Sequence, residues 1–208
     1  DMLKHADLAM YHVKHLGRNG FHFFTEALQE RVMNKIALEQ QLRSGTFQDQ
    51  LAQYYQPVIN AKNFEVCGAE MLIRWNHPLR GILAPDQFLL DVEELGFLSA
   101  IDIANMRLAF KHLSEWSLNN LVDESFVLAV NASEQLIKEE DFQITIKSDM
   151  DNAGLLGNNL SIEVTEGVLV ADFDKTSAIL NLIKAYGVKV AIDDFGTGYS
   201  SMAYLKWL

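Results

Sequence analysis

The second half of the chain repeats one pattern, in which a short apolar run is followed by a stretch with helical spacing of its apolar residues. The apolar runs are FVLAVN (126–131), LSIEVT (160–165) and VKVAID (188–193), so one repeat takes about 30 residues. Runs of this kind, rich in Val, Ile and Ala and alternating with helices, are typical of parallel strands in βαβ units. We therefore predict an α/β fold, and the length of the repeat indicates a TIM-type (β/α) barrel.

Further elements are predicted before and between these strands. QYYQPV (53–58) and VCGAEMLIRW (66–75) are predicted to be two strands joined by a turn. A (β/α) barrel usually needs about 250 residues, whereas only about 160 of the 208 residues follow residue 48. We therefore expect the barrel to be incomplete in this chain, with an open edge at the strand 188–193. Helical spacing extends over residues 101–116, about 134–153 and about 172–186.

The first part of the chain is organised differently. Residues 1–16 have helical spacing that ends at Gly17, and FHFF (21–24) is predicted to be a short strand. Residues 25–44 form a second helical pattern, which is rich in Gln, Glu and Arg and poor in Gly and Pro. We expect this second pattern to be a connecting helix, separated from the α/β part by the break at SGTF (44–47).

Side chains with oxygen ligands lie at the carboxyl ends of the predicted parallel strands. Asn131 ends the first strand, Glu163 lies near the end of the second, and Asp193 ends the third with Asp194 beside it. The carboxyl ends of barrel strands meet at one rim, so we expect these side chains to converge. Glu70, inside an otherwise apolar strand, is a further candidate.

Convergent carboxylates repel one another unless a cation neutralises them. All the candidates are oxygen donors, so the expected cation is hard, Mg²⁺ or Mn²⁺. Asp193 and Asp194 would bridge two ions, and a two-metal site would activate water for in-line displacement at phosphorus. The alternative is structural, because a lone Asp at a strand end usually caps a helix, and Asn131 with Ser133 would cap the next helix. Glu166 is expected to orient a loop rather than to hold metal.

The formal net charge of −11 argues against a broad nucleic-acid-binding face, so we expect no DNA partner. A small phosphate ligand remains compatible, because metal ions can supply positive charge. The single cysteine, Cys67, excludes an internal disulfide and a multi-Cys zinc site and fits a reducing, cytoplasmic setting. No run approaches the roughly 18 apolar residues of a membrane span, and an anchor upstream of residue 1 is compatible with the sequence.

Five segments resemble the motifs of the EAL domain family, whose signature is Glu-Ala-Leu followed by Arg-Trp and His-Pro. They stand in the family's order and spacing: YQPV (55–58), GAEMLIRWNHP (68–78), VNAS (130–133), IEVTE (162–166) and DDFGTGYSSMAYL (193–205). The resemblance covers about residues 50–208. It implies a modified TIM barrel and the hydrolysis of cyclic di-GMP to the linear dinucleotide pGpG, with Mg²⁺ or Mn²⁺.

The resemblance also implies roles for individual residues. Asp194 matches the residue associated with a second metal ion, and Glu166 matches the glutamate that steadies the loop after it, so these two are the expected catalytic residues. Arg74 matches a position that contacts the phosphate of the ligand, a task that suits a guanidinium. The first metal site corresponds to Glu70, Asn131, Glu163 and Asp193, and the ligand-lining positions correspond to Gln56 and Leu72.

The segment ADLAMYHVKHLGRNGFHFF (6–24) resembles the last helix and strand of a GGDEF domain, the cyclic di-GMP synthase fold. An upstream GGDEF domain and a sensory domain are then the expected neighbours in the parent protein. The family's later catalytic lysine, glutamate and glutamine would lie beyond Leu208. We expect three parts: a GGDEF remnant over 1–24, a helical linker over 25–46 and an EAL domain over 47–208, truncated before its last strands.

Three hypotheses follow. The first is a metal-dependent phosphodiesterase acting on cyclic di-GMP in the longer parent protein, in which case this chain alone would be inactive. The second is a cyclic di-GMP receptor without turnover, favoured by Met71, which stands where the family has Ala. A strand directs Met71 away from the face of Glu70, however, so packing can absorb the larger side chain.

The third hypothesis is a scaffold that pairs with another copy of the chain through its open edge strand, and we expect a homodimer.

Overall fold

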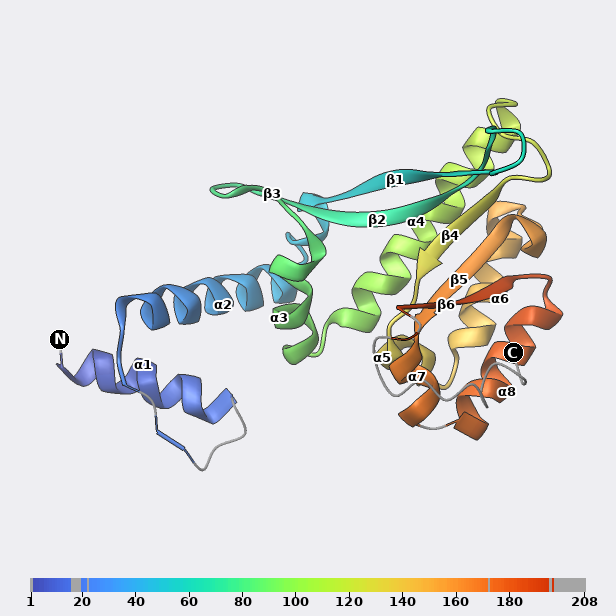
Figure 1. Cartoon of the computed structure of the whole chain (residues 1–208). Coiled ribbons are helices and arrows are strands. Elements are labelled where there is room, and N and C mark those ends of the chain that lie inside the picture. The colour runs from blue at the N-terminus through green and yellow to red at the C-terminus, as the bar shows by residue number, and fades with distance from the viewer. Residues whose placement is uncertain (1, 16–19, 22, 172, 195, 197–208) are drawn as a thin grey trace.

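The computed structural model describes residues 2–15, 20–21, 23–171, 173–194 and 196 (Figure 1). Its helices are α1 (Met2–His15), α2 (Glu26–Ser44), α3 (Leu89–Glu94), α4 (Leu98–Leu118), α5 (Glu134–Ile137), α6 (Phe142–Ala153), α7 (Glu166–Ala171) and α8 (Phe173–Ala185). Its strands are β1 (Leu51–Ile59), β2 (Val66–His77), β3 (Gly81–Leu83), β4 (Val127–Asn131), β5 (Leu160–Thr165) and β6 (Lys189–Asp193). The strands predicted for the α/β part are therefore present, close to their predicted bounds.

The strands form one six-stranded sheet in the order β1–β2–β4–β5–β6, with β3 paired to β2. β1 and β2 are antiparallel, whereas β2, β4, β5 and β6 run parallel. Helices α4, α6 and α8 lie along one side of the parallel strands (Figure 1). Within the described part of the chain, β6 is the outer strand of the sheet. The arrangement confirms the predicted βαβ units.

The main hydrophobic core lies between the parallel strands and these helices. Leu128 of β4 and Ala109 of α4 are fully buried in it. Gly68 brings β2 close to β4, because a Cβ at this position would lie 2.4 Å from the carbonyl oxygen of Val127. A larger residue there would push the two strands apart and displace Glu70, two residues further along β2.

A second core joins α2 to the α/β part. Phe47 and Trp75 make an edge-to-face contact with ring centroids 4.9 Å apart, and Leu38 of α2 is buried in the same cluster. Lys35 of α2 also forms an ion pair with Glu94 of α3. The carboxyl half of the predicted linker helix is therefore packed against the α/β part.

The short strand predicted at FHFF is wrong. Residues 20–21 and 23–24 have no regular secondary structure, and the side chains of Phe21 and Phe23 are 82% and 77% exposed. A short apolar run becomes a stable strand only where neighbouring strands support it, and no described strand pairs with this run. Phe24 instead packs against His5 of α1 and against the buried side chains of Leu28 and Val32.

The single helix predicted over residues 134–153 is divided into α5 and α6. Leu136, Ile137 and Phe142 are all buried. In a continuous helix, Phe142 would point to the side opposite Leu136 and Ile137, since each residue turns the helix by about 100°. The break after Ile137 allows all three side chains to enter the main core. No helix in the described part of the chain is long and apolar enough to cross a membrane.

Candidate functional site at the carboxyl ends of the parallel strands

The register of the sheet places the predicted oxygen ligands on one face. Asn131 pairs directly with Glu163. Glu70 pairs with the residue two positions before Asn131, and Asp193 pairs with the residue two positions after Glu163. Side chains two residues apart in a strand point to the same face. The four side chains therefore share one face of the sheet, staggered along it as neighbouring strands of a barrel are.

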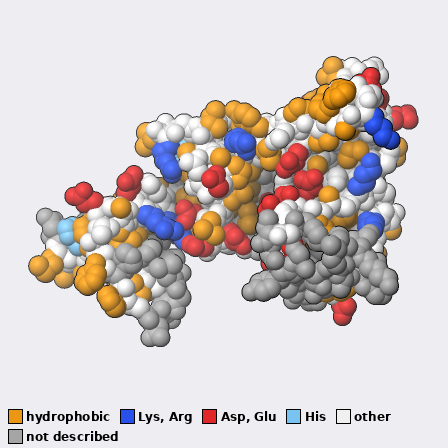
Figure 2. Space-filling view, viewed as in Figure 1, with side chains coloured by type: hydrophobic (Ala, Val, Ile, Leu, Met, Phe, Trp, Pro, Cys, Tyr) orange, Lys and Arg blue, Asp and Glu red, His pale blue; other side chains and the backbone are white. Residues whose placement is uncertain are grey.

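A cavity of about 410 Å³ lies over this face. Figure 2, which has the same view as Figure 1, shows acidic side chains gathered near the end of β4. The cavity has an acidic side and an apolar side, the latter from β2, α3 and the start of α4. Predicted site residues among its lining are Glu70, Leu72, Asn131, Glu163, Asp193 and Asp194.

Asn131 is the neutral member of the group and joins two of the strands. Its Nδ2 donates a hydrogen bond to Oε1 of Glu70 at 3.2 Å. The cap of α5 is Ser133, whose Oγ accepts a hydrogen bond from the backbone N–H of Leu136 at 3.2 Å. The capping role that the sequence left open therefore falls to Ser133, and the side chain of Asn131 is directed to the site.

The acids repel one another at Glu163. Burial, and after it the nearby carboxylates of Glu70 and Asp193, together raise the pKa of Glu163 to about 6. A carboxyl group in such surroundings holds its proton more tightly than one in water. A cation beside Glu163 would favour the ionised form and so offset the effects of burial and of the neighbouring acids, as is expected at a metal ligand.

The chain turns sharply after β6. Asp194 has a backbone φ of 54°, in the left-handed region that non-glycine residues rarely occupy, and its N–H donates to Oδ1 of Asp193 at 2.8 Å. The N–H of Gly196 donates to Oε2 of Glu166 at 3.4 Å, a long bond. Glu166 is the first residue of α7 and is only 7% exposed, so its carboxylate lies beside the turn that carries the acid pair.

The predicted ligand-lining residues lie on the antiparallel ribbon of β1 and β2. Gln56 pairs with Glu70 across the ribbon, so their side chains share the face of the site. Leu72 lines the cavity, and Arg74 lies on the same face of β2 two residues further on. The guanidinium of Arg74 lies over the ring of Tyr54, 5.5 Å from its centroid. Gln56 and Arg74 lie beside the cavity rather than among its lining residues.

The donor set suits a hard divalent cation, because it consists of carboxylate and amide oxygens. Among the described residues, however, no group of three or more His, Cys, Asp or Glu side chains lies close enough to form a metal site by itself. The structure therefore places the predicted ligands on one face of the sheet and around one cavity, but their carboxylates are not close enough together to form a metal site by themselves. The raised pKa of Glu163 shows that bringing them together has an electrostatic cost.

Sequence reasoning missed two polar residues of α4 that line the cavity, Asp102 and Asn105. Burial raises the pKa of Asp102 to about 6, while hydrogen bonds from Ser133 work in the opposite direction. Asn105 is buried and accepts a hydrogen bond from Nε2 of Gln53 at 3.1 Å. The available signal was spacing, since Asp102 stands four residues before buried Met106 and thus continues the inward face of α4.

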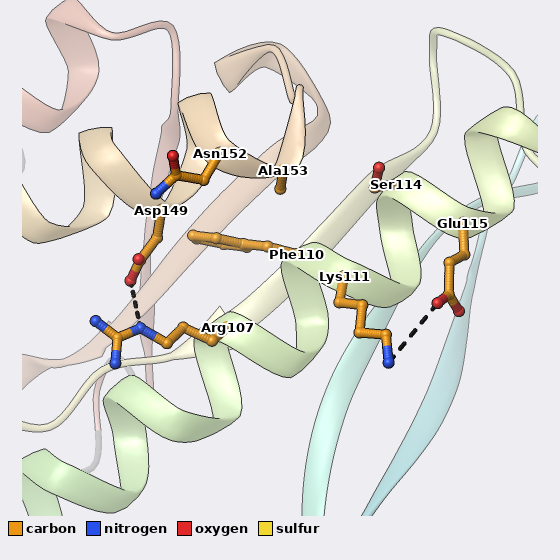
Figure 3. Close-up of a pocket in the computed structure, with 8 residues that line it drawn as sticks. All are labelled: Arg107, Phe110, Lys111, Ser114, Glu115, Asp149, Asn152 and Ala153. Carbon is orange, nitrogen blue, oxygen red and sulfur yellow. Dashed lines mark hydrogen bonds and ion pairs between the residues drawn. The ribbon is translucent and has the colours of Figure 1, made fainter.

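A second hollow, of about 390 Å³, lies between α4 and α6 (Figure 3). Nε of Arg107 donates to Oδ2 of Asp149 at 2.8 Å, and Nζ of Lys111 lies 3.9 Å from Oε1 of Glu115. These charges are paired with one another, and none of the predicted site residues lines this hollow.

The family model of the EAL domain matches residues 38–208. The chain belongs to the EAL domain family. The fold is accordingly the modified TIM barrel of that family, of which the described strands form an open part. The match begins inside α2, and the domain borders predicted at residues 24 and 46 remain predictions.

Curated relatives match the chain along its whole length. The cyclic di-GMP phosphodiesterase NbdA of Pseudomonas aeruginosa is 36% identical over 208 residues, which are 100% of this chain and 26% of NbdA. The bifunctional diguanylate cyclase/cyclic di-GMP phosphodiesterase MucR of the same organism is 35% identical over 208 residues, 100% of this chain and 30% of MucR. The chain thus spans about a quarter to a third of the length of these EAL relatives.

A solved structure of the MucR phosphodiesterase in complex with cyclic di-GMP superimposes on this EAL domain with a TM-score of 0.76. The two are 34% identical, and the match covers 83% of this chain and 69% of that one.

Proposed function

We propose that this EAL domain hydrolyses cyclic di-GMP to linear pGpG within a longer protein. The strand register carries the proposal, because it brings Glu70, Asn131, Glu163 and Asp193 to one face over a cavity. The similarity to NbdA and MucR, both described as cyclic di-GMP phosphodiesterases, supports the choice of substrate.

Glu70, Asn131, Glu163 and Asp193 would hold one Mg²⁺ or Mn²⁺ ion, and Asp194 would contribute to a second. Bound divalent ions supply a water of lowered pKa and neutralise charge on a phosphate that is attacked. Asn131 contributes a neutral oxygen, so it adds a ligand without adding to the repulsion among the acids. The left-handed backbone of Asp194 turns the chain immediately after β6, which keeps both acids of the pair at the rim of the sheet.

The remaining residues bind and orient the nucleotide. Arg74 offers a planar set of donors on the same face as Glu70, suited to a phosphodiester oxygen. Leu72 provides part of the apolar wall for a base or ribose, and Gln56 offers an amide across the ribbon from Glu70. Glu166 holds the turn after Asp194 through the N–H of Gly196 and so acts on position rather than on the phosphate.

A cyclic di-GMP receptor without turnover is the second candidate. The cavity combines acidic and apolar lining residues, which would bind a nucleotide whether or not hydrolysis follows. The sequence argument for a receptor weakens, however, because the side chain of Met71 is packed in the main core and is only 5% exposed, although Met71 also contributes to the lining of the cavity.

The test uses the full-length protein that carries this chain, incubated with Mn²⁺ and cyclic di-GMP, with products separated by chromatography. The proposal predicts pGpG as the product and its loss in Asp193→Asn. Tight nucleotide binding by the wild-type protein with no pGpG after hours at micromolar enzyme would support the receptor instead.

A further inference from the structure

Asp102 lies on α4 with its carboxylate against the turn that follows β4. Its Oδ2 accepts a hydrogen bond from the backbone N–H of Ser133 at 3.0 Å, and the carboxyl group lines the cavity of the candidate site. Asp102 and Ser133 are 31 residues apart in the sequence. The contact therefore links the helix on one side of the sheet to the polar rim of the strands.

The turn from Asn131 to Ser133 is held by three different elements. The side chain of Asn131 donates to Glu70 on β2, and the N–H of Ala132 donates to the carbonyl oxygen of Glu163 on β5 at 2.9 Å. The N–H of Ser133 donates to Asp102 on α4. Each of the three consecutive residues thus has its own anchor, and that of Ser133 is supplied by a helix rather than by a neighbouring strand.

Stability alone does not explain a carboxylate at this position. Burial raises the pKa of Asp102, which means that the folded protein disfavours the ionised form. Met106 and Ala109, which continue the same face of α4, are buried apolar residues. An apolar residue at position 102 would remove the cost of burying a charge, but would leave the N–H of Ser133 without its acceptor.

We propose that Asp102 is a positioning residue, which fixes the turn from Asn131 to Ser133 and thereby holds the side chain of Asn131 in the candidate site. The inference rests on the proposed function in so far as Asn131 is a metal ligand. The positioning depends on an acceptor for the N–H of Ser133. Asp102→Asn retains this hydrogen bond through its amide oxygen, whereas Asp102→Ala loses it. Partners that orient metal ligands typically change metal affinity about 10- to 100-fold when they are removed.

The first experiment measures amide hydrogen exchange of Ser133 in this chain, without metal. The matched control is Asp149→Ala, which removes another helical carboxylate that accepts a hydrogen bond from a different element, outside the cavity (Figure 3). Asp102→Ala should accelerate exchange at Ser133 about 10-fold or more. Asp102→Asn and Asp149→Ala should leave it within about threefold of wild type. Unchanged exchange at Ser133 in Asp102→Ala would overturn the proposal.

The second experiment measures the affinity of the same variants for Mn²⁺ by titration calorimetry. Asp102→Ala should weaken binding about 10-fold or more, while Asp102→Asn and Asp149→Ala bind Mn²⁺ like wild type to within about threefold. Faster exchange combined with unchanged Mn²⁺ affinity would overturn the positioning role and leave the metal site intact. A wild-type protein that binds no Mn²⁺ contradicts the proposed function instead. The exchange rate of Ser133 then tests, without metal, whether Asp102 fixes the turn from Asn131 to Ser133.

Discussion

Nδ2 of Asn131 lies 3.2 Å from Oε1 of Glu70, and the hydrogen bond between them joins β4 to β2 inside the candidate site. An amide at this position can donate to one acid, whereas a fourth carboxylate would add repulsion. The pairing of a neutral ligand with charged ones therefore limits the electrostatic cost of bringing the strand-end side chains together. That cost is visible at Glu163, whose pKa is raised by burial and by the carboxylates of Glu70 and Asp193.

Glu163→Gln should have opposite effects on stability and on metal binding. Without metal, the substitution removes a charge that burial and the carboxylates of Glu70 and Asp193 disfavour. Because solvent screens this half-buried group, the free energy of unfolding should rise by only about 1 kcal/mol, or about 2–4 °C in the midpoint. Affinity for Mn²⁺ should fall about 10-fold or more, because an anionic ligand is lost. Thermal unfolding in a chelator and Mn²⁺ titration measure the two effects.

Glu139→Gln is the matched control, since Glu139 is an exposed acid between α5 and α6. It should change neither quantity appreciably. A Glu163→Gln protein that is destabilised without metal, yet binds Mn²⁺ like wild type, would show that Glu163 is structural.

Arg74→Ala should weaken binding of cyclic di-GMP about 10-fold while leaving Mn²⁺ affinity unchanged, because the guanidinium is placed to bind phosphate rather than metal. Arg43→Ala serves as the control. The guanidinium of Arg43 also lies over an aromatic ring, 5.9 Å from the centroid of Phe97, but Arg43 belongs to α2 and does not line the candidate site. Nucleotide titration of both variants separates the roles. Equal losses in the two would point to a general effect of removing positive charge.

Asp102→Asn should become more stable relative to wild type as the pH rises from about 4 to about 7. The pKa of Asp102 is raised from 3.8 to about 6 by burial, so the unfolded chain loses this proton at a lower pH than the folded chain. The free energy of unfolding of wild type therefore falls through that window, by up to about 3 kcal/mol. Denaturant unfolding at several pH values measures the difference, and a difference independent of pH would contradict the raised pKa.

The outer position of β6 predicts association between copies of the chain. Among the described strands β6 pairs with β5, and an outer strand of this kind can pair with a strand of another chain. We expect a concentration-dependent dimer in size-exclusion chromatography with light scattering. A monomer at all concentrations would argue that the exposed charge of Lys189 is enough to protect this edge.

Sequence patterns predicted most residues of the candidate site, because the proposed ligands lie in or at the ends of apolar strands. Asn131 and Asp193 close an apolar run, Glu163 lies near the end of one, and Glu70 lies inside one, so strand periodicity predicts that they lie on one face of the sheet. The spacing of Asp102 on α4 could have predicted its inward orientation, but not its role, because that role depends on a contact with Ser133, 31 residues away in the sequence.

The errors in the fold have the same origin. FHFF has the composition of a strand, but lacks a neighbour in the described structure. The helix over 134–153 breaks because Phe142 must reach the same core as Leu136. In both cases tertiary packing overrides the local preference. The residues after Gly196, which include most of the last EAL motif, lie outside the described part of the chain.

The central claim is that side chains at the ends of neighbouring strands bind a divalent cation. Anomalous diffraction from crystals of this chain soaked in Mn²⁺ tests it most directly. The account predicts a manganese peak within about 2.5 Å of oxygen atoms from Glu70, Asn131, Glu163 and Asp193. A map without a peak among these residues at saturating Mn²⁺, with their side chains pointing apart, would contradict it.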